Sequence, residues 1–273
     1  MQNYLILTLL SILLFSCRKE ANVKLPVTKS LPVINCFICP EDTIYRVKVT
    51  LSQPLYANTG ADIYTPVNNA IVEIKGNQGN AQFIYNLNSE YYELKASSYT
   101  LVPGEKYKLT VTTTNGDIAS AETQIPLNLI SIDNVSFENV KDQYSLIKNF
   151  KVSFTDDTVN KNYYNLSIAA LFKYSNGDTL YNDSGIRTLY DDINNNGKNT
   201  TLSGRFYYNE GDTIPAFDVY LLNCTPEYYK YHLSLQNYSG DNPFAEPTLV
   251  FNNIKGGYGI FASYRKFRKR ITI

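Results

Sequence analysis

Apolar and polar side chains alternate along much of the chain, which is the pattern of β-strands with one buried face. In "YRVKVTL", residues 45–51, four apolar side chains alternate with an arginine, a lysine and a threonine. Because successive side chains of a strand point to opposite faces, this spacing predicts a half-buried strand. The run "AIVEIKGNQGNAQFIYNL", residues 70–87, predicts two further strands around a glycine-containing loop.

A β-hairpin is predicted at "EKYKLTVTTTNGDIASAETQI", residues 105–125, with Asn115-Gly116 at its tip. Asn-Gly is the strongest short-range hairpin signal, because both residues tolerate the positive φ of the turn. About seven short strands fall between residues 31 and 125, a spacing typical of a β-sandwich. We therefore predict an immunoglobulin-like sandwich over residues 31–126. Only the architecture is claimed, since the chain has no tryptophan for the Cys–Trp–Cys signature of true immunoglobulin domains.

A second β domain is predicted over residues 127–273, after the proline that ends the first. Its strand-like runs include "LISIDNVSF", "FKVSFTD" and "LSGRFYY", and one helix interrupts them. In "NCTPEYYKYHLSLQNYSG", Thr225 is suited to the N-cap, Pro226 to the first helical position and Glu227 to the positive end of the helix dipole. The sequence thus predicts a mainly all-β fold with one short helix near residues 226–237.

The first residues have the pattern of an export signal. The run "YLILTLLSILLFS", residues 4–16, carries no charge and is shorter than the roughly 20 apolar residues that span a bilayer. Its end, "LFSC", resembles a bacterial lipobox, in which the cysteine receives a diacylglycerol and the signal is cut before it. We expect a lipoprotein signal peptide over residues 1–16, lipidation of Cys17 and a lipidated tether over residues 17–30. An ordinary cleaved signal followed by an unrelated cysteine is the alternative.

Composition narrows the function classes. The 25 Lys and Arg residues balance the 25 Asp and Glu residues. The formal net charge is therefore zero, which gives no overall attraction to nucleic acid. Tyrosine is abundant at 24 residues, and tryptophan is absent. Together with frequent Asn-rich turns, this composition favours a β-rich exported protein over a helical cytosolic enzyme.

Three cysteines follow the leader: Cys36 and Cys39 in "CFIC", and Cys224. An extended strand separates residues three apart by roughly 10 Å, whereas a disulfide needs Cα atoms within about 7 Å. A Cys36–Cys39 bond therefore requires a bend. We expect all three cysteines to be small buried residues. A disulfide from Cys224 to either of the others stays open, because an exported protein meets an oxidising compartment.

The C-terminal part of the chain resembles a known family. A Tyr-rich helix in "LLNCTPEYYKYHLSLQ", followed by "NPFAEPTLVFNNIKGGYGIFASY", resembles the C-terminal hallmark of domain-of-unknown-function family 4249, a group of Gram-negative lipoproteins. The segment "GEKYKLTV", residues 104–111, and the junction at residues 126–133 match further patterns of that family. The resemblance covers nearly all of the chain after the leader.

This resemblance implies a location and a partner. Members of the family are outer-membrane lipoproteins that are typically encoded beside TonB-dependent receptors. It therefore implies contact with outer-membrane lipid through acylated Cys17, and a TonB-dependent receptor as partner. The family has no established activity, so the resemblance supplies no catalytic residue. Whether the protein faces the periplasm or the cell surface stays open.

The stretch "DDINNNG" holds one candidate metal site. Asp192, Asn194 and Asn196, followed by a glycine, match the D-x-N-x-N-G start of a calcium-binding loop. Oxygen-bearing side chains at alternate positions converge on a hard cation, while the glycine permits a sharp turn. The twelfth position, however, is Ser203 and not the glutamate of an EF-hand, and no helical pattern flanks the loop. A structural turn is the alternative, and no cofactor other than calcium is suggested.

No set of residues predicts an enzyme. His232 is the only histidine, and neither a G-x-S-x-G nor an HExxH motif accompanies it. Asp156 and Asp157 could serve glycoside hydrolysis only across a cleft, and adjacent aspartates are more simply a solvated turn. The cations of "RKFRKR", residues 265–270, could contact lipid headgroups or an acidic partner. They could equally form a charged edge strand that prevents sheet aggregation.

The leading hypothesis is a non-catalytic binding accessory, an outer-membrane lipoprotein that helps a TonB-dependent receptor to take up a nutrient. The rival is a structural or envelope-assembly lipoprotein without a small ligand, and a surface glycoside hydrolase is a third hypothesis. Tyrosine clusters such as "EYYEL" and "EYYKY" could form a carbohydrate or peptide platform or pack in two-sided strands. A concave pocket would favour the binding accessory over the structural rival.

Overall fold

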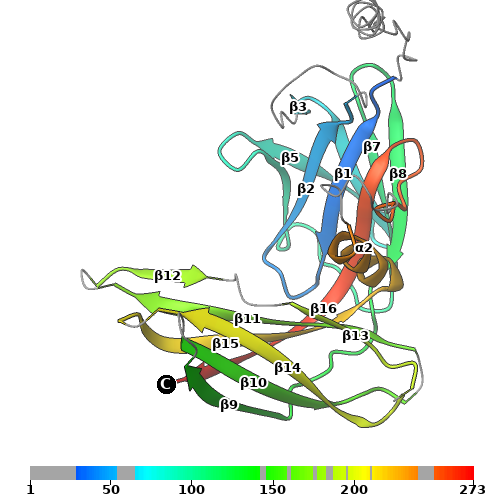
Figure 1. Ribbon diagram of the computed structural model, residues 1–273. Helices are drawn as coiled ribbons and strands as arrows, with labels where there is room; N and C mark the ends of the chain where they lie inside the picture. The colour runs from blue at the N-terminus through cyan, green and yellow to red at the C-terminus, as the bar shows by residue number, and fades with distance from the viewer. Residues whose placement is uncertain are drawn as a thin grey trace, which may run out of the picture.

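The computed structural model describes residues 29–53, 65–141, 146–158, 161–174, 177–182, 187–194, 196–209, 211–238 and 249–273. Within them, two β-rich modules meet at an angle and form an L, with helix α2 (Pro226–Gln236) beside the corner (Figure 1). Cys17, the expected lipidation site, lies outside the described residues. In the described part of the chain, no helix is long and apolar enough to cross a membrane.

The first module is a sandwich of antiparallel strands with the order β1-β2-β6-β5-β4-β7-β8. Strand β5 belongs to both layers, since residues up to Phe83 pair with β4 and residues from Ile84 pair with β6. The apolar core, which includes Val47, Val72 and Leu109, lies between the layers. The strands are β1 (Pro32–Ile38), β2 (Ile44–Leu51), β3 (Thr65–Pro66), β4 (Ile71–Gly76), β5 (Gly79–Asn86), β6 (Tyr91–Lys95), β7 (Lys106–Thr112) and β8 (Ile118–Gln124).

The second module is a second β-sandwich. A three-stranded sheet, β14-β10-β9, packs under a sheet that runs β12-β11-β15-β16 (Figure 1). Between them, Phe217 packs against Phe150 and Phe206, with ring centroids 5.1 and 5.3 Å apart. The strands are β9 (Asn134–Lys141), β10 (Leu146–Thr155), β11 (Tyr163–Lys173), β12 (Thr179–Asn182), β13 (Thr188–Asp191), β14 (Asn199–Tyr208) and β15 (Thr213–Cys224).

One long strand, β16 (Tyr258–Thr272), belongs to both modules. Its residues 258–263 pair in parallel with β1, and residues 264–272 pair antiparallel with β15. The C-terminal segment also supplies Ile254 and Phe261 to the first core. The structure therefore departs from a division at residue 126, because the end of the chain returns to complete the first module. Long crossover connections between parallel strands leave no local pattern that predicts this return.

The mainly β fold with one described helix is the predicted one, and its local elements are confirmed. Tyr45, Val47 and Val49 turn into the first core. Gly116 has a φ of 84° in the turn between β7 and β8, which an L side chain rarely adopts. Thr225 caps α2, since its side-chain oxygen accepts a hydrogen bond from the backbone N of Tyr228 at 3.4 Å.

The three described cysteines confirm the expected role as small buried residues. Cys36, Cys39 and Cys224 are all buried, and all are free thiols. Burial raises the pKa of Cys36 and Cys224 far above that of an exposed thiol. Neither of the disulfides left open by the sequence forms, and the buried thiols stay protonated and unreactive.

Candidate functional site

A cavity of about 610 Å³, which we name the corner pocket, opens where the two modules meet. Its floor is the outer face of the sheet made by β11, β15 and β16, and residues of β1 and α2 close one end. In Figure 1 this face lies in the inner angle of the L, because the three-stranded sheet covers the opposite face.

The alternation of each strand decides which side chains reach the corner pocket. On β15, Phe217, Val219 and Leu221 point into the second core, so Tyr220 and Leu222 point to the opposite face and line the pocket. Tyr264 and Lys266 do the same on β16. These strands are therefore covered on both faces, by the core below and by the pocket above.

Aromatic rings make one wall of the corner pocket. Phe37 of β1 packs against Tyr228 and His232 of α2, with centroid distances of 5.2 and 5.3 Å. Tyr228 in turn contacts Tyr264 of β16 at 5.6 Å. Tyr181 and Tyr220 add two more rings to the lining. Helix α2 is thus fixed against both modules through the pocket wall.

Burial changes the ionisation of this wall. It lowers the pKa of His232 to about 4, with a further contribution from the positive charge of Arg187. It also raises the pKa of Tyr228 and Tyr264 well above the ordinary phenol value. At neutral pH the imidazole and both phenols are therefore uncharged.

One buried acceptor in the wall of the corner pocket lacks a hydrogen-bond donor among the described residues. Asn165 of β11 is 2% exposed, and its Nδ2 donates to the hydroxyl of Tyr228 at 2.9 Å. Its Oδ1 has no hydrogen-bond partner among the described residues. A buried acceptor without a donor costs about 1–3 kcal/mol, so such groups in native proteins usually have a functional or structural reason.

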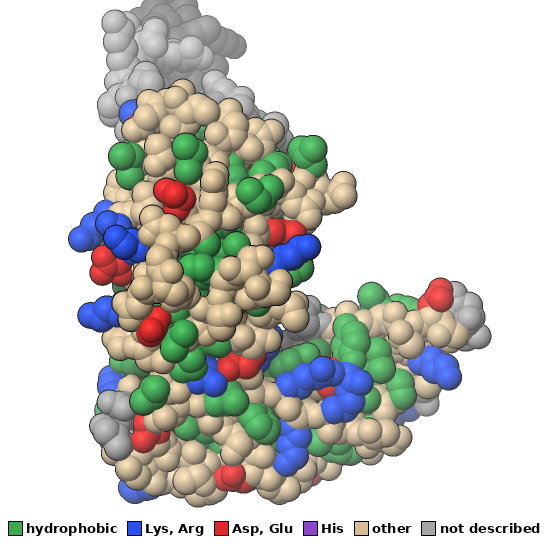
Figure 2. Space-filling model, turned by 180° about the vertical axis from the view of Figure 1, so that it is seen from behind, with side chains coloured by type: hydrophobic (Ala, Val, Ile, Leu, Met, Phe, Trp, Pro, Cys, Tyr) green, Lys and Arg blue, Asp and Glu red, His purple; other side chains and the backbone are tan. Residues whose placement is uncertain are grey.

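The floor carries several cations. Arg187 and Lys266 line the corner pocket, and Arg268 and Arg270 continue the same face, where both donate to Asp218 at 2.7–2.9 Å. Asp218 forms ion pairs with both arginines of β16, and Asp42 forms one with Lys266. Figure 2 shows Lys and Arg side chains gathered on the lower arm close to the inner angle. The guanidinium and ammonium groups on this face can still donate to the anionic group of a ligand.

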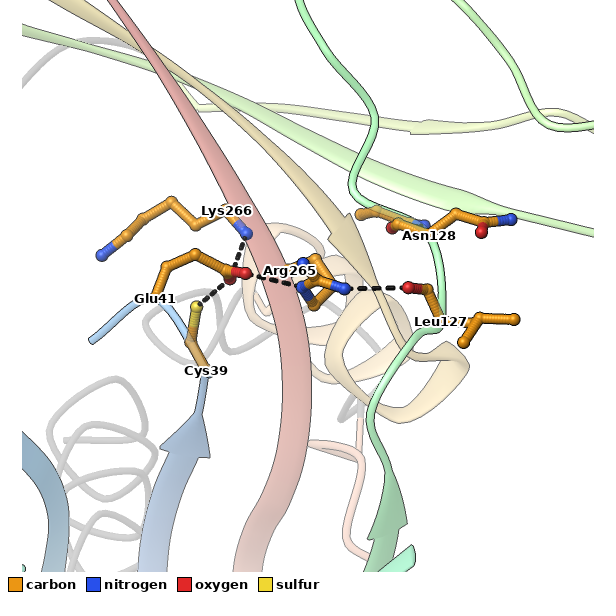
Figure 3. A network of polar contacts seen from close by, with 7 residues as sticks. Cys39, Glu41, Leu127, Asn128, Arg265 and Lys266 are labelled. Atoms are coloured by element: carbon orange, nitrogen blue, oxygen red, sulfur yellow. Dashed lines mark hydrogen bonds and ion pairs between the residues drawn. The ribbon is translucent and has the colours of Figure 1, made fainter. Parts of the chain in front are cut away.

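A network of polar contacts, which we name the elbow clamp, fixes the angle between the modules (Figure 3). Glu41, in the turn after β1, accepts from Arg265 Nε at 2.6 Å and from the backbone N of Lys266 at 3.0 Å. Cys39 Sγ donates to the same carboxylate at 3.0 Å, and Arg265 Nη1 donates to the carbonyl of Leu127 at 2.8 Å. The clamp therefore joins β1, β16 and the segment between the modules.

Glu41 is ionised in the elbow clamp. Burial alone would raise the pKa of its carboxyl group, but hydrogen bonds from Cys39, the backbone N of Lys266 and the Arg265 guanidinium outweigh burial and hold that pKa below its ordinary value. The clamp is thus a charge-assisted contact in a partly buried position.

The residues of the predicted calcium loop separate in the structure. Asp192 is buried, whereas Asn194 and Asn196 are exposed. Residue 195 lies outside the described residues. The loop joins β13 to β14, and Ser203, at the twelfth position, pairs with Lys151 in the middle of β14. Asp192 is therefore the one member of the motif that the fold places inside.

The two aspartates considered for hydrolysis have different surroundings. Asp156 is buried and bonded to Tyr164, whereas Asp157 is partly exposed and accepts from Asn128 Nδ2 at 2.6 Å. Asp157 lines a second cavity of about 530 Å³ between the modules. No aromatic side chain lines that cavity in the described part of the chain, so it offers less to a small ligand than the corner pocket does.

The basic tail is paired within the protein. Besides the clamp and Asp218 contacts, Lys269 Nζ donates to the backbone carbonyls of Ile132 and Asp133 at 3.3 and 3.0 Å. Among the described strands, residues 264–272 pair with β15 alone, so they form an edge of the sheet. The charged-edge explanation therefore accounts for these cations better than a free lipid-binding patch does.

The corner pocket was not predicted from the sequence. Its lining comes from six elements, and from the residue before β13, between Phe37 and Lys266, and none of these residues forms a motif. The available signal was weak: aromatic residues at the outward positions of β15 and β16, such as Tyr220 and Tyr264, beside strands whose other face is apolar.

The model of the family described as "Domain of unknown function (DUF4249)" matches residues 18–270. No curated protein matches the chain.

Proposed function

This chain belongs to the DUF4249 family, and on that premise we propose that it is a non-catalytic binding protein of the outer membrane. Lipid on Cys17 anchors it, and its partner in nutrient uptake is a TonB-dependent receptor. The observation that carries the binding role is the corner pocket, about 610 Å³ of concave space lined by aromatic rings and by Arg187 and Lys266. Small ligands bind in such concave sites, where a few polar groups stand among apolar walls.

The chemistry of the corner pocket favours an anionic ligand with a flat apolar or sugar-ring face. Tyrosine rings such as Tyr181 and Tyr220 offer apolar faces together with a hydroxyl group. The guanidinium of Arg187 matches a carboxylate or phosphate group. A hydroxyl or N–H of the ligand near Asn165 would supply the donor that Oδ1 lacks among the described residues.

The uncharged side chains in the wall of the corner pocket are consistent with a binding role without catalysis. A general acid or base works best with a pKa near the working pH. The pKa of His232 lies at about 4, and the phenols of Tyr228 and Tyr264 hold their protons. These groups therefore contribute shape and hydrogen bonds to the pocket and do not exchange protons at neutral pH.

In this proposal the corner pocket lies away from the membrane. The described chain enters β1 at Pro32, at the end of the first module that lies far from the corner of the L (Figure 1). Phe37, near the other end of β1, lines the pocket. Lipid on Cys17 confines the protein to two dimensions, which raises its effective concentration near a receptor in the same membrane.

The receptor partnership is tested with the full lipidated chain in its own membranes. After mild crosslinking, the chain is purified and its partners are identified by mass spectrometry. We expect a TonB-dependent receptor to co-purify, and we expect Cys17→Ala to reduce that recovery at least several-fold. Recovery of the wild-type chain without any receptor would contradict the partnership and favour the structural rival.

The ligand role is tested with two matched variants. Ser167→Phe places a ring in the corner pocket, whereas Ser203→Phe places one on the exposed outer face of β14. Native mass spectrometry of chains purified from cells should show a small-molecule adduct in the wild type and in Ser203→Phe, and none in Ser167→Phe. Equal adducts in both variants would contradict the pocket as the ligand site, and an adduct-free wild type would favour a structural role.

A further inference from the structure

Two buried carboxyl groups meet beneath the β13–β14 turn. Asp156, just after β10, is 5% exposed, and Asp192, just after β13, is 1% exposed. Asn162 joins them, since its backbone N donates to Asp192 Oδ2 at 2.8 Å and its Nδ2 donates to Asp156 Oδ1 at 3.3 Å. Both carboxyl groups therefore lie within hydrogen-bond reach of the same residue.

Hydrogen-bond donors are distributed unequally between the two carboxyl groups. Asp156 also accepts from the hydroxyl of Tyr164 and from the backbone N of Gly197, the latter at 2.9 Å. Asp192 Oδ1, in contrast, is buried and has no hydrogen-bond partner among the described residues. Within the described part of the chain, no Lys or Arg forms an ion pair with either aspartate.

Two adjacent carboxylates out of water are costly unless something neutralises them. Asp156 and Asp192 are only 5% and 1% exposed, so little water reaches either carboxylate to screen the repulsion. A proton shared by the pair would remove the repulsion. A divalent cation would remove it as well, and would also give Asp192 Oδ1 a partner.

We propose that Asp156 and Asp192 bind a calcium ion that fixes the β13–β14 turn to the end of β10. This inference is independent of the proposed function of the corner pocket. The two carboxylates balance the charge of Ca²⁺. The site differs from the loop motif in the sequence, because its second ligand is Asp156, just after β10, and not Asn194 or Asn196.

The surroundings of the pair suit a hard cation. The carbonyl oxygen of Asp157 lies beside the site, where it accepts from Asn162 Nδ2 at 3.5 Å. Among the described residues there is no group of three His, Cys, Asp or Glu side chains that could hold a metal. The remaining ligands must therefore be carbonyl, amide and water oxygens, which calcium accepts in flexible numbers and magnesium accepts less readily.

Gly197 lets the turn close over the pair. Its φ is 72°, and a Cβ at this position would lie 2.6 Å from Cγ2 of Thr158. The glycine of the sequence motif is therefore required for the turn to reach the chain next to Asp156, which brings the Gly197 N–H to its carboxylate.

The test uses the full chain stripped of metal with EGTA. Thermal unfolding followed by near-UV circular dichroism should show a midpoint that rises with added CaCl₂, and with MgCl₂ only weakly. Asp192→Asn should lose this response. Asp212→Asn is the matched control, because it changes an exposed turn aspartate of the same module, and it should keep the full response.

A second measurement does not depend on a folded variant. Tb³⁺ in the site would lie close to Tyr164, whose hydroxyl contacts Asp156, and should show saturable emission on tyrosine excitation that Ca²⁺ displaces. Absence of displaceable emission, together with a midpoint that Ca²⁺ does not shift, would overturn the proposal. A midpoint that instead rises as the pH falls would show that a shared proton neutralises the pair.

Discussion

The two halves of β16 share one backbone, but their environments differ. In residues 258–263, Ile260, Phe261 and Ala262 are fully buried. The edge opposite β1 is covered there by Asn253, whose side-chain amide makes hydrogen bonds of 2.7 and 3.0 Å to the backbone of Phe261. Residues 264–272 are the charged half, and their open edge meets the Glu41 carboxylate at Lys266 N.

This difference shows two ways to manage the edge of a sheet. In the first half, the side-chain amide of Asn253 makes the hydrogen bonds that a neighbouring strand would otherwise make to the backbone. The second half carries cations, which discourage pairing with another protein, and each cation is held by an acid or a carbonyl of this chain. The transition between the two occurs at the elbow clamp.

Gly259→Ala should have the largest effect on stability, because it places a methyl group in the buried half of β16, where the strand packs closely against β1. Gly259 has a φ of 107°, and a Cβ there would lie 1.9 Å from the carbonyl oxygen of Ile34. We expect a loss of more than about 4 kcal/mol in the free energy of unfolding, measured by urea denaturation. Gly211→Ala is the control, since Gly211 has a φ of 100° with nothing within 4 Å. It should lose about 1–3 kcal/mol from backbone strain alone. Equal losses would show that the approach to β1 is not tight.

Glu41→Gln should have the next largest effect. It removes the charge that faces Arg265 while keeping the shape of the side chain, and both side chains of that pair are mostly buried, at 24% and 12% exposure. We expect a loss of about 3 kcal/mol, because Arg265 is left without its counter-ion. Glu90→Gln, in the exposed pair with Lys48, should cost less than about 1 kcal/mol. A similar small cost for both variants would mean that the clamp does not stabilise the elbow.

The contribution of Glu41 should depend on pH. Its pKa in the folded state lies below the ordinary value of 4.5, so its stabilisation is complete above that value and is lost as the pH falls through the lower folded-state pKa. The difference in unfolding free energy between the wild type and Glu41→Gln should therefore be constant from pH 7 to pH 5 and shrink in more acidic buffer. A difference that does not change with pH would exclude an ionic clamp.

Asp218→Asn should have the smallest effect, because it acts on the charged half. Asp218 is 1% exposed, but its partners Arg268 and Arg270 are 47% and 43% exposed and remain well hydrated without it. We expect a loss of about 1 kcal/mol, since the amide keeps one acceptor for the guanidinium groups. A double-mutant cycle with Arg270→Gln measures the coupling, and a coupling as large as the Glu41 effect would contradict the contrast between the two halves.

Local patterns predicted the elements of this fold but not their long-range partners. The alternation around Val47, the Asn115-Gly116 turn and the Thr225 cap each depend on neighbours within a few residues, and all three are present. The split of β16 depends on β1, which lies more than 200 residues earlier in the chain.

The candidate site was predicted only in fragments. Asp192 was singled out by its motif, but its burial against Asp156 depends on strand pairing in the second module. The corner pocket depends on the outward faces of three strands that meet only in the folded protein. A sequence pattern predicts which side chains share one face of a strand. A pocket depends on which faces meet in the folded protein, and local spacing does not predict that.

The parallel pairing of β1 with β16 determines how the molecule bears tension. A pull between residue 29 and the far module draws the start of β1 and the end of β16 in opposite directions. Six residue pairs, Val33–Tyr258 to Ile38–Ser263, then resist sliding along the strand axis together. A pull in this direction therefore loads all six pairs at once and does not open them one at a time.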